Sequence, residues 1–141
     1  WLNQQTQKTR RGAAWAEMRY FTEEYFKEVE RRLLEDPTWQ QNTKGIKTTI
    51  LLTATDQSES FLIKVEEGVT SVNKVDPATQ SEFTFEGEYE NWTKVAKGEV
   101  DLQSAVLKGM LKFKGSITKI LFYKDRFIRI ADVIRSTQME F

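Results

Sequence analysis

The stretch WTKVAKGEVDLQSAVLKGMLKFKGSITKI, residues 92–120, decides the fold. Residues 90–98 and 101–109 each predict a short helix that ends at a glycine, the residue that most easily takes the left-handed backbone at a helix stop. MLKFK, residues 110–114, alternates apolar and basic side chains, which is typical of a half-buried strand. Residues 116–136 then predict a long helix with a broad apolar stripe. The order is therefore two short helices, a strand and a closing helix.

The ends of these helices carry capping signals. Asn91, Asp101 and Ser116 have side-chain oxygens that can accept a hydrogen bond from the first turn, so each is a candidate N-cap.

Lysines beside glycines could also indicate a phosphate loop, but such a loop needs G-x-x-x-x-G-K-[ST]. In GMLKFKGS the lysine, Lys114, precedes the second glycine, and the interval alternates like a strand. The phosphate-loop interpretation therefore fails.

Upstream, one helix and four strands are predicted. The helix begins at Ala13 and ends at Asp36-Pro37, because the residue before a proline avoids helical angles. Its apolar positions recur at helical steps: Trp15, Met18, Tyr25, Phe26, Val29 and Leu33. Alternating or β-branched runs predict strands over 47–55, 58–68, 69–75 and 81–89. Grouped strands with helices at the ends indicate an α+β fold, a five-stranded, mostly antiparallel sheet covered by helices. Residues 1–12 are expected to be a flexible lead, and 13–141 a single domain.

Composition argues against most enzyme classes. The 141 residues contain no histidine and no cysteine, which removes the commonest general base, the commonest metal ligands and the Ser-His and Cys-His nucleophile systems. We therefore expect no catalysis, no cofactor and no metal. Cysteine-free sequence suits a reducing compartment, so a cytoplasmic location is expected. No run reaches the about 18 apolar residues of a membrane span. The chain opens at Trp1 without a methionine, so targeting from the N-terminus cannot be judged.

Charge is balanced overall but segregated along the chain. Basic and acidic residues both number 21, and this neutrality argues against a nucleic-acid partner, which needs a positive footprint. Residues 54–92 hold nine acids and two bases, whereas 106–141 hold eight bases and three acids. Two solvated faces are the plain interpretation. The sharper hypothesis is a transient contact of the basic C-terminal part with an anionic membrane surface.

The quoted stretch resembles the most characteristic segment of the sterol carrier protein lipid-binding domain. Matching positions are Gly98, Asp101, Gln103, Ala105, Gly109, Leu111, Lys112, Phe113 and Gly115. SFLIKVEEGV and SEFTFEGEYENW, further upstream, resemble two strands of the same family, so the resemblance covers about residues 46–136. It implies a five-stranded sheet covered by helices around an apolar tunnel that binds fatty acids, acyl-CoA, sterols or other lipids without turnover. Lys108, where the family often has glutamine, and Thr118, where it often has glycine, put a sterol in doubt.

The predicted function is binding and transfer of a hydrophobic ligand, a fatty acid, acyl-CoA or similar lipid. The predicted ligand-binding residues are the inward apolar side chains, the tryptophan at the strand-to-helix corner, one hydroxyl and one lysine: Phe83, Phe85, Trp92, Leu111, Phe113, Ile117, Ile120, Leu121, Tyr123 and Lys108. Two alternatives stay open. One is a ligand-free interaction or regulatory module of the same fold, and the other is an accessory domain of a larger enzyme. Sequence does not indicate the oligomeric state.

Overall fold

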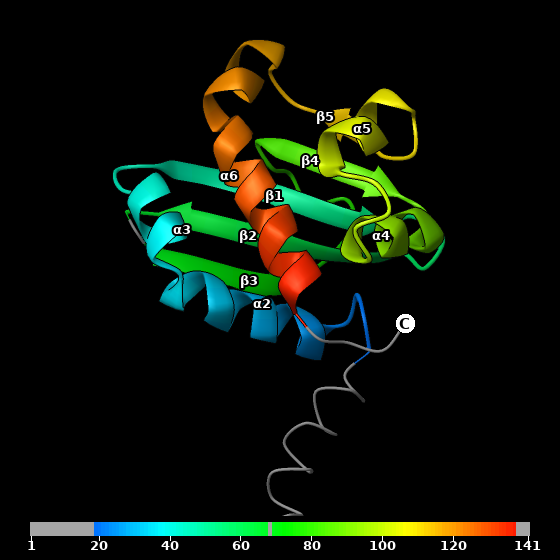
Figure 1. Ribbon diagram of the computed structural model, residues 1–141, viewed down its shortest axis with the longest axis horizontal. Helices are drawn as coiled ribbons and strands as arrows, with labels where there is room; N and C mark the ends of the chain where they lie inside the picture. The colour runs from blue at the N-terminus through cyan, green and yellow to red at the C-terminus, as the bar shows by residue number, and fades with distance from the viewer. Residues whose placement is uncertain (1–18, 68, 138–141) are drawn as a thin grey trace, which may run out of the picture.

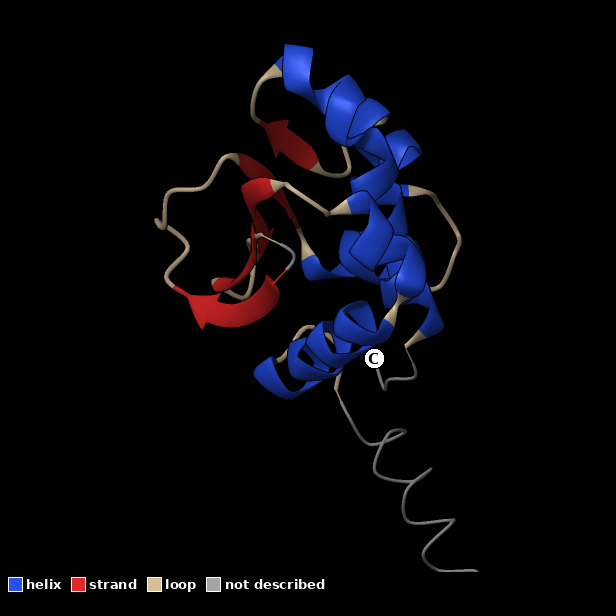
Figure 2. Cartoon of the chain, turned by 90° about the vertical axis from the view of Figure 1, so that its left-hand side faces the viewer, coloured by secondary structure: helices blue, strands red, loops and turns tan. Residues whose placement is uncertain are grey.

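The structure is a computed structural model that describes residues 19–67 and 69–137. A five-stranded sheet in the order β3-β2-β1-β4-β5 lies against a layer of helices (Figures 1 and 2). The strands are β1 (Lys47–Ala54), β2 (Glu59–Glu66), β3 (Val69–Val75), β4 (Phe83–Gly87) and β5 (Lys112–Lys114). The helices are α2 (Glu23–Glu35), α3 (Pro37–Asn42), α4 (Tyr89–Ala96), α5 (Leu102–Leu107) and α6 (Ile117–Ser136).

Strand pairing confirms the predicted mostly antiparallel sheet. β1 pairs with β2, β2 with β3 and β4 with β5 in antiparallel fashion, while β1 and β4 run parallel. The parallel pair β1–β4 lies in the interior of the sheet. The segment that joins β3 to β4 has to pass β2 and β1 so that β4 can pair with β1. Each predicted strand lies within two residues of its observed bounds, because either alternation or a run of β-branched and apolar residues marks it in the sequence.

One face of the sheet forms the core. In the ladder Ile50 stands opposite Ile63 and Leu52 opposite Phe61, so alternate side chains of both strands point to the same face. These four side chains are 0 to 3% exposed. α2 packs along the β3 edge with its buried stripe, and α6 runs across the face (Figures 1 and 2). Among residues 19–67 and 69–137, no helix is long and apolar enough to span a bilayer.

The long first helix is shorter than predicted. α2 begins only at Glu23, where Thr22 caps it by accepting a hydrogen bond from the Tyr25 amide. Phe21 has a φ of 59° and cannot continue a helix from residues further upstream. Its side chain is 2% exposed and packs edge-on against Phe26. The core contact thus overrides the helical periodicity. The predicted flexible lead, Ala13, Trp15 and Met18 lie outside the described residues.

Two further local predictions need correction. Asn91 does not cap α4: the helix starts after Glu88, and the Asn91 side-chain amide instead donates to the Met110 carbonyl at 3.0 Å. Asp36-Pro37 ends α2 as predicted, but it also starts α3, with Asp36 as N-cap and Pro37 in the first turn. The predicted caps Asp101 and Ser116 are confirmed, since both accept a hydrogen bond from the first turn of their helix.

Candidate functional site

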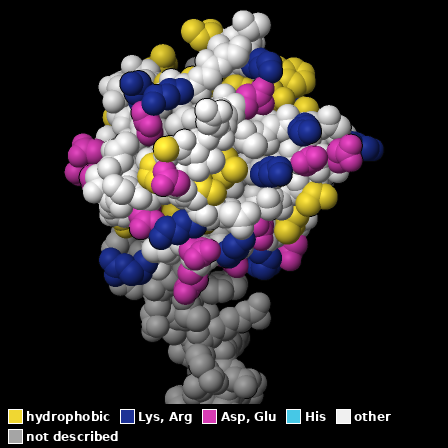
Figure 3. Space-filling view, turned by 180° about the vertical axis from the view of Figure 1, so that it is seen from behind, with side chains coloured by type: hydrophobic (Ala, Val, Ile, Leu, Met, Phe, Trp, Pro, Cys, Tyr) yellow, Lys and Arg dark blue, Asp and Glu magenta, His cyan; other side chains and the backbone are white. Residues whose placement is uncertain are grey.

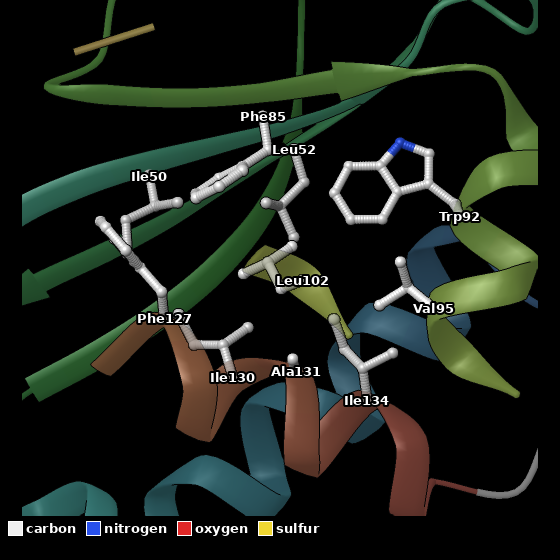
Figure 4. A pocket seen from close by; sticks show the side chains of 10 residues that line it. All are labelled: Ile50, Leu52, Phe85, Trp92, Val95, Leu102, Phe127, Ile130, Ala131 and Ile134. Carbon is white, nitrogen blue, oxygen red and sulfur yellow. The ribbon is translucent and has the colours of Figure 1, made fainter. Parts of the chain in front are cut away.

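An apolar pocket lies between the sheet and the second half of α6 (Figure 4). Its lining comes from five elements: Ile50 and Leu52 of β1, Phe85 of β4, Trp92 and Val95 of α4, Leu102 of α5, and Phe127, Ile130, Ala131 and Ile134 of α6. None of these side chains is charged. The indole N–H of Trp92 donates to the Thr53 carbonyl at 2.9 Å and is therefore already satisfied within the protein. The pocket offers an apolar ligand an apolar surface and no specific polar partner.

The sequence places these residues together through two periodicities. Leu52 stands opposite Phe85 in the parallel pair, so the walls from β1 and β4 come from side chains that point to the same face. On α6, Phe127, Ile130 and Ile134 follow at steps of three and four, which puts them on one face of the helix. That face lies over the sheet (Figure 4). The pocket is the space that these two apolar surfaces leave between them.

The pocket is nearly closed. Its volume is about 10 Å³, which is room for about one water molecule. A hydrocarbon chain does not fit in this space without movement of a wall. Among the described residues this pocket is therefore not the open apolar tunnel that the resemblance implies, although the fold itself is the expected one.

A larger groove lies directly outside the pocket. It has a volume of about 260 Å³ and is lined by Val95, Val100, Asp101, Leu102, Gln103, Ile128, Ala131, Asp132 and Arg135. Val95, Leu102 and Ala131 line both spaces. These three side chains are thus the partition between the groove and the pocket, and displacement of one of them would join the two volumes.

α5 is the most lightly anchored part of this partition. It has six residues, and Ala105 is its only buried side chain. Gly98 and Gly109 flank the segment with φ values of 78° and 76°, a backbone region that glycine enters at little cost. Leu102, the first residue of α5, is only partly buried. Small buried area predicts local opening at a low free energy, so α5 is the element best suited to move.

Two buried tyrosines anchor the other two helices of the pocket wall, α4 and α6. The Tyr20 hydroxyl donates to the Trp92 carbonyl at 2.9 Å, and the Tyr25 hydroxyl donates to the Ile134 carbonyl at 3.3 Å. Burial raises the pKa of both hydroxyls well above the usual range, so both stay protonated and remain donors. They hold the backbone of α4 and of the end of α6 in place around the pocket.

The structure separates the predicted ligand-binding residues into three groups. Phe85 and Trp92 line the pocket. Beside it, Phe83 forms an aromatic cluster with Tyr123 and Phe127, whose ring centroids lie 5.1 Å away, and Phe113 packs against the same cluster. The cluster is filled, and none of its members except Phe127 borders the pocket. Leu111 is buried and Ile120 partly buried outside the lining.

The third group is exposed. Ile117 is 81% exposed, Leu121 is 78% exposed, and Lys108 faces solvent. The first turns of α6 extend past β5, the edge strand (Figure 1), which is consistent with the exposure of these two apolar side chains. Whether any of the ten predicted residues contacts a ligand stays a prediction.

Sequence reasoning missed most of the pocket wall. Ile50, Leu52, Val95 and Leu102 were not among the predicted ligand-binding residues, nor were the four residues of α6. The apolar stripe of the closing helix does extend to Ile134, so the signal was present. Periodicity gives the face of a helix but not which of its turns overlie the sheet.

Acids beside the sheet that the structure describes form ion pairs and no metal-binding cluster. In the part of the chain that the structure describes, His, Cys, Asp and Glu nowhere gather in the groups of three or more that could hold a metal ion. Two acids at β4 form ion pairs with lysines: a carboxylate oxygen of Glu82, just before the strand, lies 2.7 Å from the Lys119 Nζ, and one of Glu86, within it, lies 3.2 Å from the Lys114 Nζ. Burial acts to raise the pKa of Glu82, but hydrogen bonds from Lys119 and Thr48 outweigh it and lower that pKa.

Comparison with known proteins agrees with this fold. The sequence model of the SCP-2 sterol transfer family matches residues 26–125. A crystal structure of sterol carrier protein 2 superposes with a TM-score of 0.73 at 19% identity, covering 84% of this chain and 98% of that one. A conserved hypothetical protein of Thermus thermophilus gives 0.72 at 19% identity, covering 88% and 93%. Palmitated SCP2L2 of Aedes aegypti gives 0.53 at 14% identity, covering 83% and 96%. No curated protein sequence matches the chain.

Proposed function

Because the chain belongs to the SCP-2 sterol transfer family, we propose that it binds a lipid with a long hydrocarbon chain and transfers it without chemical change. The observation that carries the proposal is the pocket behind Leu102, whose ten lining side chains are all apolar. A fatty acid, an acyl-CoA or a similar acyl lipid fits this lining best. The palmitated neighbour supports an acyl ligand, since a protein of the same fold holds one. The cysteine-free sequence fits a reducing compartment such as the cytoplasm.

The driving force is removal of hydrocarbon from water. Each buried CH₂ group contributes about 0.8 kcal/mol, so a chain of about sixteen carbons offers roughly 12 kcal/mol. Ordering of the chain and loss of free translation subtract several kcal/mol. Micromolar or tighter binding therefore requires no polar contact in the pocket, which is consistent with its lining.

Loading requires the partition to open. Movement of α5 would withdraw Leu102 and join the pocket to the groove of about 260 Å³. The aliphatic chain would then thread between Ala131 and the displaced leucine, with its headgroup left in the groove. A flexible acyl chain passes a narrow opening more easily than a rigid ring system does, so a sterol is the less favoured ligand.

Displacement of a fluorescent fatty acid tests this function. Wild-type protein should enhance the fluorescence of cis-parinaric acid, and palmitate should reverse the increase. Ala131→Trp fills the partition and should weaken binding at least about tenfold, whereas Ala78→Trp, which adds the same bulk on an exposed loop, should not change it. Circular dichroism checks that both variants fold. Leu102→Ala instead truncates one of the three side chains of the partition and should speed release.

The closed pocket favours one alternative, a ligand-free interaction module of the same fold. A volume of about 10 Å³ is what a filled core leaves. Native mass spectrometry of protein purified from its source separates the two. A co-purifying acyl lipid supports the carrier. A clean apo mass, together with no binding of parinaric acid by the wild type, would overturn the proposed function in favour of the module.

A further inference from the structure

α6 carries a second apolar stripe that faces solvent. Ile117, Leu121 and Ile128 are 81%, 78% and 41% exposed. Together with Lys124 they follow at steps of four, three and four residues, which places all four within an arc of about 60° on the helix surface. Most of a second face of the helix is therefore apolar and uncovered. We call these four residues the outer stripe.

The outer stripe lies at one end of the molecule. Its first two members are in the turns of α6 that extend beyond β5, at the end of the molecule away from the C-terminal end of α6 (Figures 1 and 2). Seen from behind, this end of the molecule shows hydrophobic side chains with one basic and one acidic side chain beside them (Figure 3). Exposed apolar side chains that cluster, rather than scatter, indicate an interaction surface.

The charges around this end are mostly positive. Residues 106–126 contain six basic residues and one acid, Asp125. Lys114 and Lys119 are paired with Glu86 and Glu82. Lys112 and Lys124 form no salt bridge with any residue that the structure describes, so their charge is available to a partner.

We propose that the outer stripe and these lysines dock the protein on a bilayer that contains anionic lipids. Leucine and isoleucine side chains would enter the interface, and the lysines would meet the headgroups. The proposal rests on the proposed lipid-binding function, because Ile128, the inner end of the stripe, also lines the groove outside the pocket. A lipid leaving the bilayer beside Ile117 would thus pass along the stripe, past Lys124, to Ile128 and the groove beside Leu102.

The charges disfavour a second copy of the chain as the occupant. A symmetric dimer through the stripe would bring two ends of the same sign together, with Lys124 of each copy close to its symmetry mate. Like charges at a closed interface oppose association. An anionic bilayer supplies both the apolar layer and the opposite charge that this surface lacks.

Co-sedimentation with vesicles tests the docking surface. Wild-type protein should sediment with vesicles of phosphatidylcholine and phosphatidylserine, and much less with phosphatidylcholine alone. The double variant Ile117→Ser, Leu121→Ser should lose at least about tenfold in partitioning, since both side chains are exposed and would no longer enter the interface. Lys124→Gln should lose about fivefold, and added salt should weaken the wild type in the same way.

Matched controls lie elsewhere on the surface. Val69→Ser removes an apolar side chain that is 66% exposed on β3, and Lys47→Gln neutralises an exposed lysine on β1. Both should sediment like the wild type. Equal sedimentation with both vesicle types, or an unchanged double variant, would overturn the docking proposal. So would a shift from dimer to monomer in the double variant without loss of vesicle binding, since a second copy would then occupy the stripe.

The two proposals can be refuted independently of each other. Parinaric acid binding in solution involves the pocket alone, so the double variant should retain it. If the protein binds parinaric acid but does not bind vesicles, the proposed lipid-binding function stands and the docking proposal is refuted. If the protein sediments with anionic vesicles but binds no parinaric acid, the proposed lipid-binding function is refuted and the membrane contact stands.

Discussion

Replacement of Asp36 by alanine should destabilise the protein more than replacement by asparagine, because this carboxylate makes two separate contacts. One oxygen, Oδ2, accepts a hydrogen bond from the Trp39 amide at 2.9 Å and so caps α3. Both oxygens also accept from Arg129 of α6, at 2.6 and 2.7 Å. Asp36 therefore connects the α2–α3 corner to the helix that covers the pocket.

The magnitude follows from the two contacts. Loss of an N-cap costs about 1 kcal/mol, and asparagine is as good a cap as aspartate. Charge-assisted hydrogen bonds contribute about 1.5–3 kcal/mol, but the lower end applies because the Arg129 side chain is 33% exposed, although that of Asp36 is only 10% exposed. We expect a loss of about 1–2 kcal/mol in the free energy of unfolding for Asp36→Asn and about 2–3 kcal/mol for Asp36→Ala.

Urea unfolding at neutral pH measures both losses, and a double-mutant cycle isolates the pair. Asp36→Asn combined with Arg129→Gln should show a coupling of about 1 kcal/mol. The pair Asp132–Arg135, whose side chains are 37% and 45% exposed, provides the control and should show almost none. Equal losses for the asparagine and alanine variants would refute the capping role. A coupling near zero would refute the ion pair.

The same contact predicts a pH dependence. The Arg129 guanidinium, above all through its hydrogen bonds, lowers the pKa of Asp36 from its ordinary 3.8. A depressed folded-state pKa stabilises the protein at pH values above the unfolded-state pKa, and this stabilisation is lost as the pH falls through the folded-state value. The difference in unfolding free energy between wild type and Asp36→Asn should therefore be full at neutral pH and shrink below about pH 3.8. A constant difference down to lower pH would contradict the assignment.

Two further substitutions test contacts that fix the sheet to its surroundings. Thr70→Val leaves the buried indole N–H of Trp39, which donates to the threonine hydroxyl at 2.9 Å, without an acceptor, and should cost about 1–3 kcal/mol by urea unfolding. Retention of full stability would mean that the N–H finds another partner. Gly87→Ala would place a Cβ 2.7 Å from the Met110 carbonyl oxygen, a backbone atom, and should cost about 1–3 kcal/mol. Gly109→Ala, which meets nothing within 4 Å but has a φ of 76°, should cost only about 1 kcal/mol, and the reverse order would show that strain rather than crowding dominates.

The sequence predicts most of the secondary structure because local rules and the fold agree there. The alternation of Phe61, Ile63 and Val65 is the alternation of buried positions along β2, and Asp101 and Ser116 cap the helices that they precede. The prediction fails where a tertiary contact overrides a local pattern. Phe21 has a left-handed backbone because its ring is buried against other aromatic side chains, and nothing in a helical period signals that.

The candidate site was harder to predict than the fold. Phe85 could be assigned because a strand side chain points to one definite face, and Trp92 because it lies at the corner between β4 and α4. The residues of α6 could not, because a twenty-residue helix is longer than the sheet that it crosses, and its apolar stripe does not say which turns overhang. The ligand-binding residues predicted on α6 lie in its first two turns, whereas the α6 residues that line the pocket lie in its later turns.

The unusual apolar width of α6 is explained by two faces with the same spacing. Tyr123, Phe127, Ile130 and Ile134 follow at steps of four, three and four, and all are buried. The outer stripe repeats these steps from Ile117 and is exposed, and it alone contains a charged residue, Lys124. A lysine at a stripe position is costly in a core but favourable at the surface of an anionic membrane. The position of that charge thus distinguishes, within the sequence itself, the face that builds the pocket from the face that is free to bind a partner.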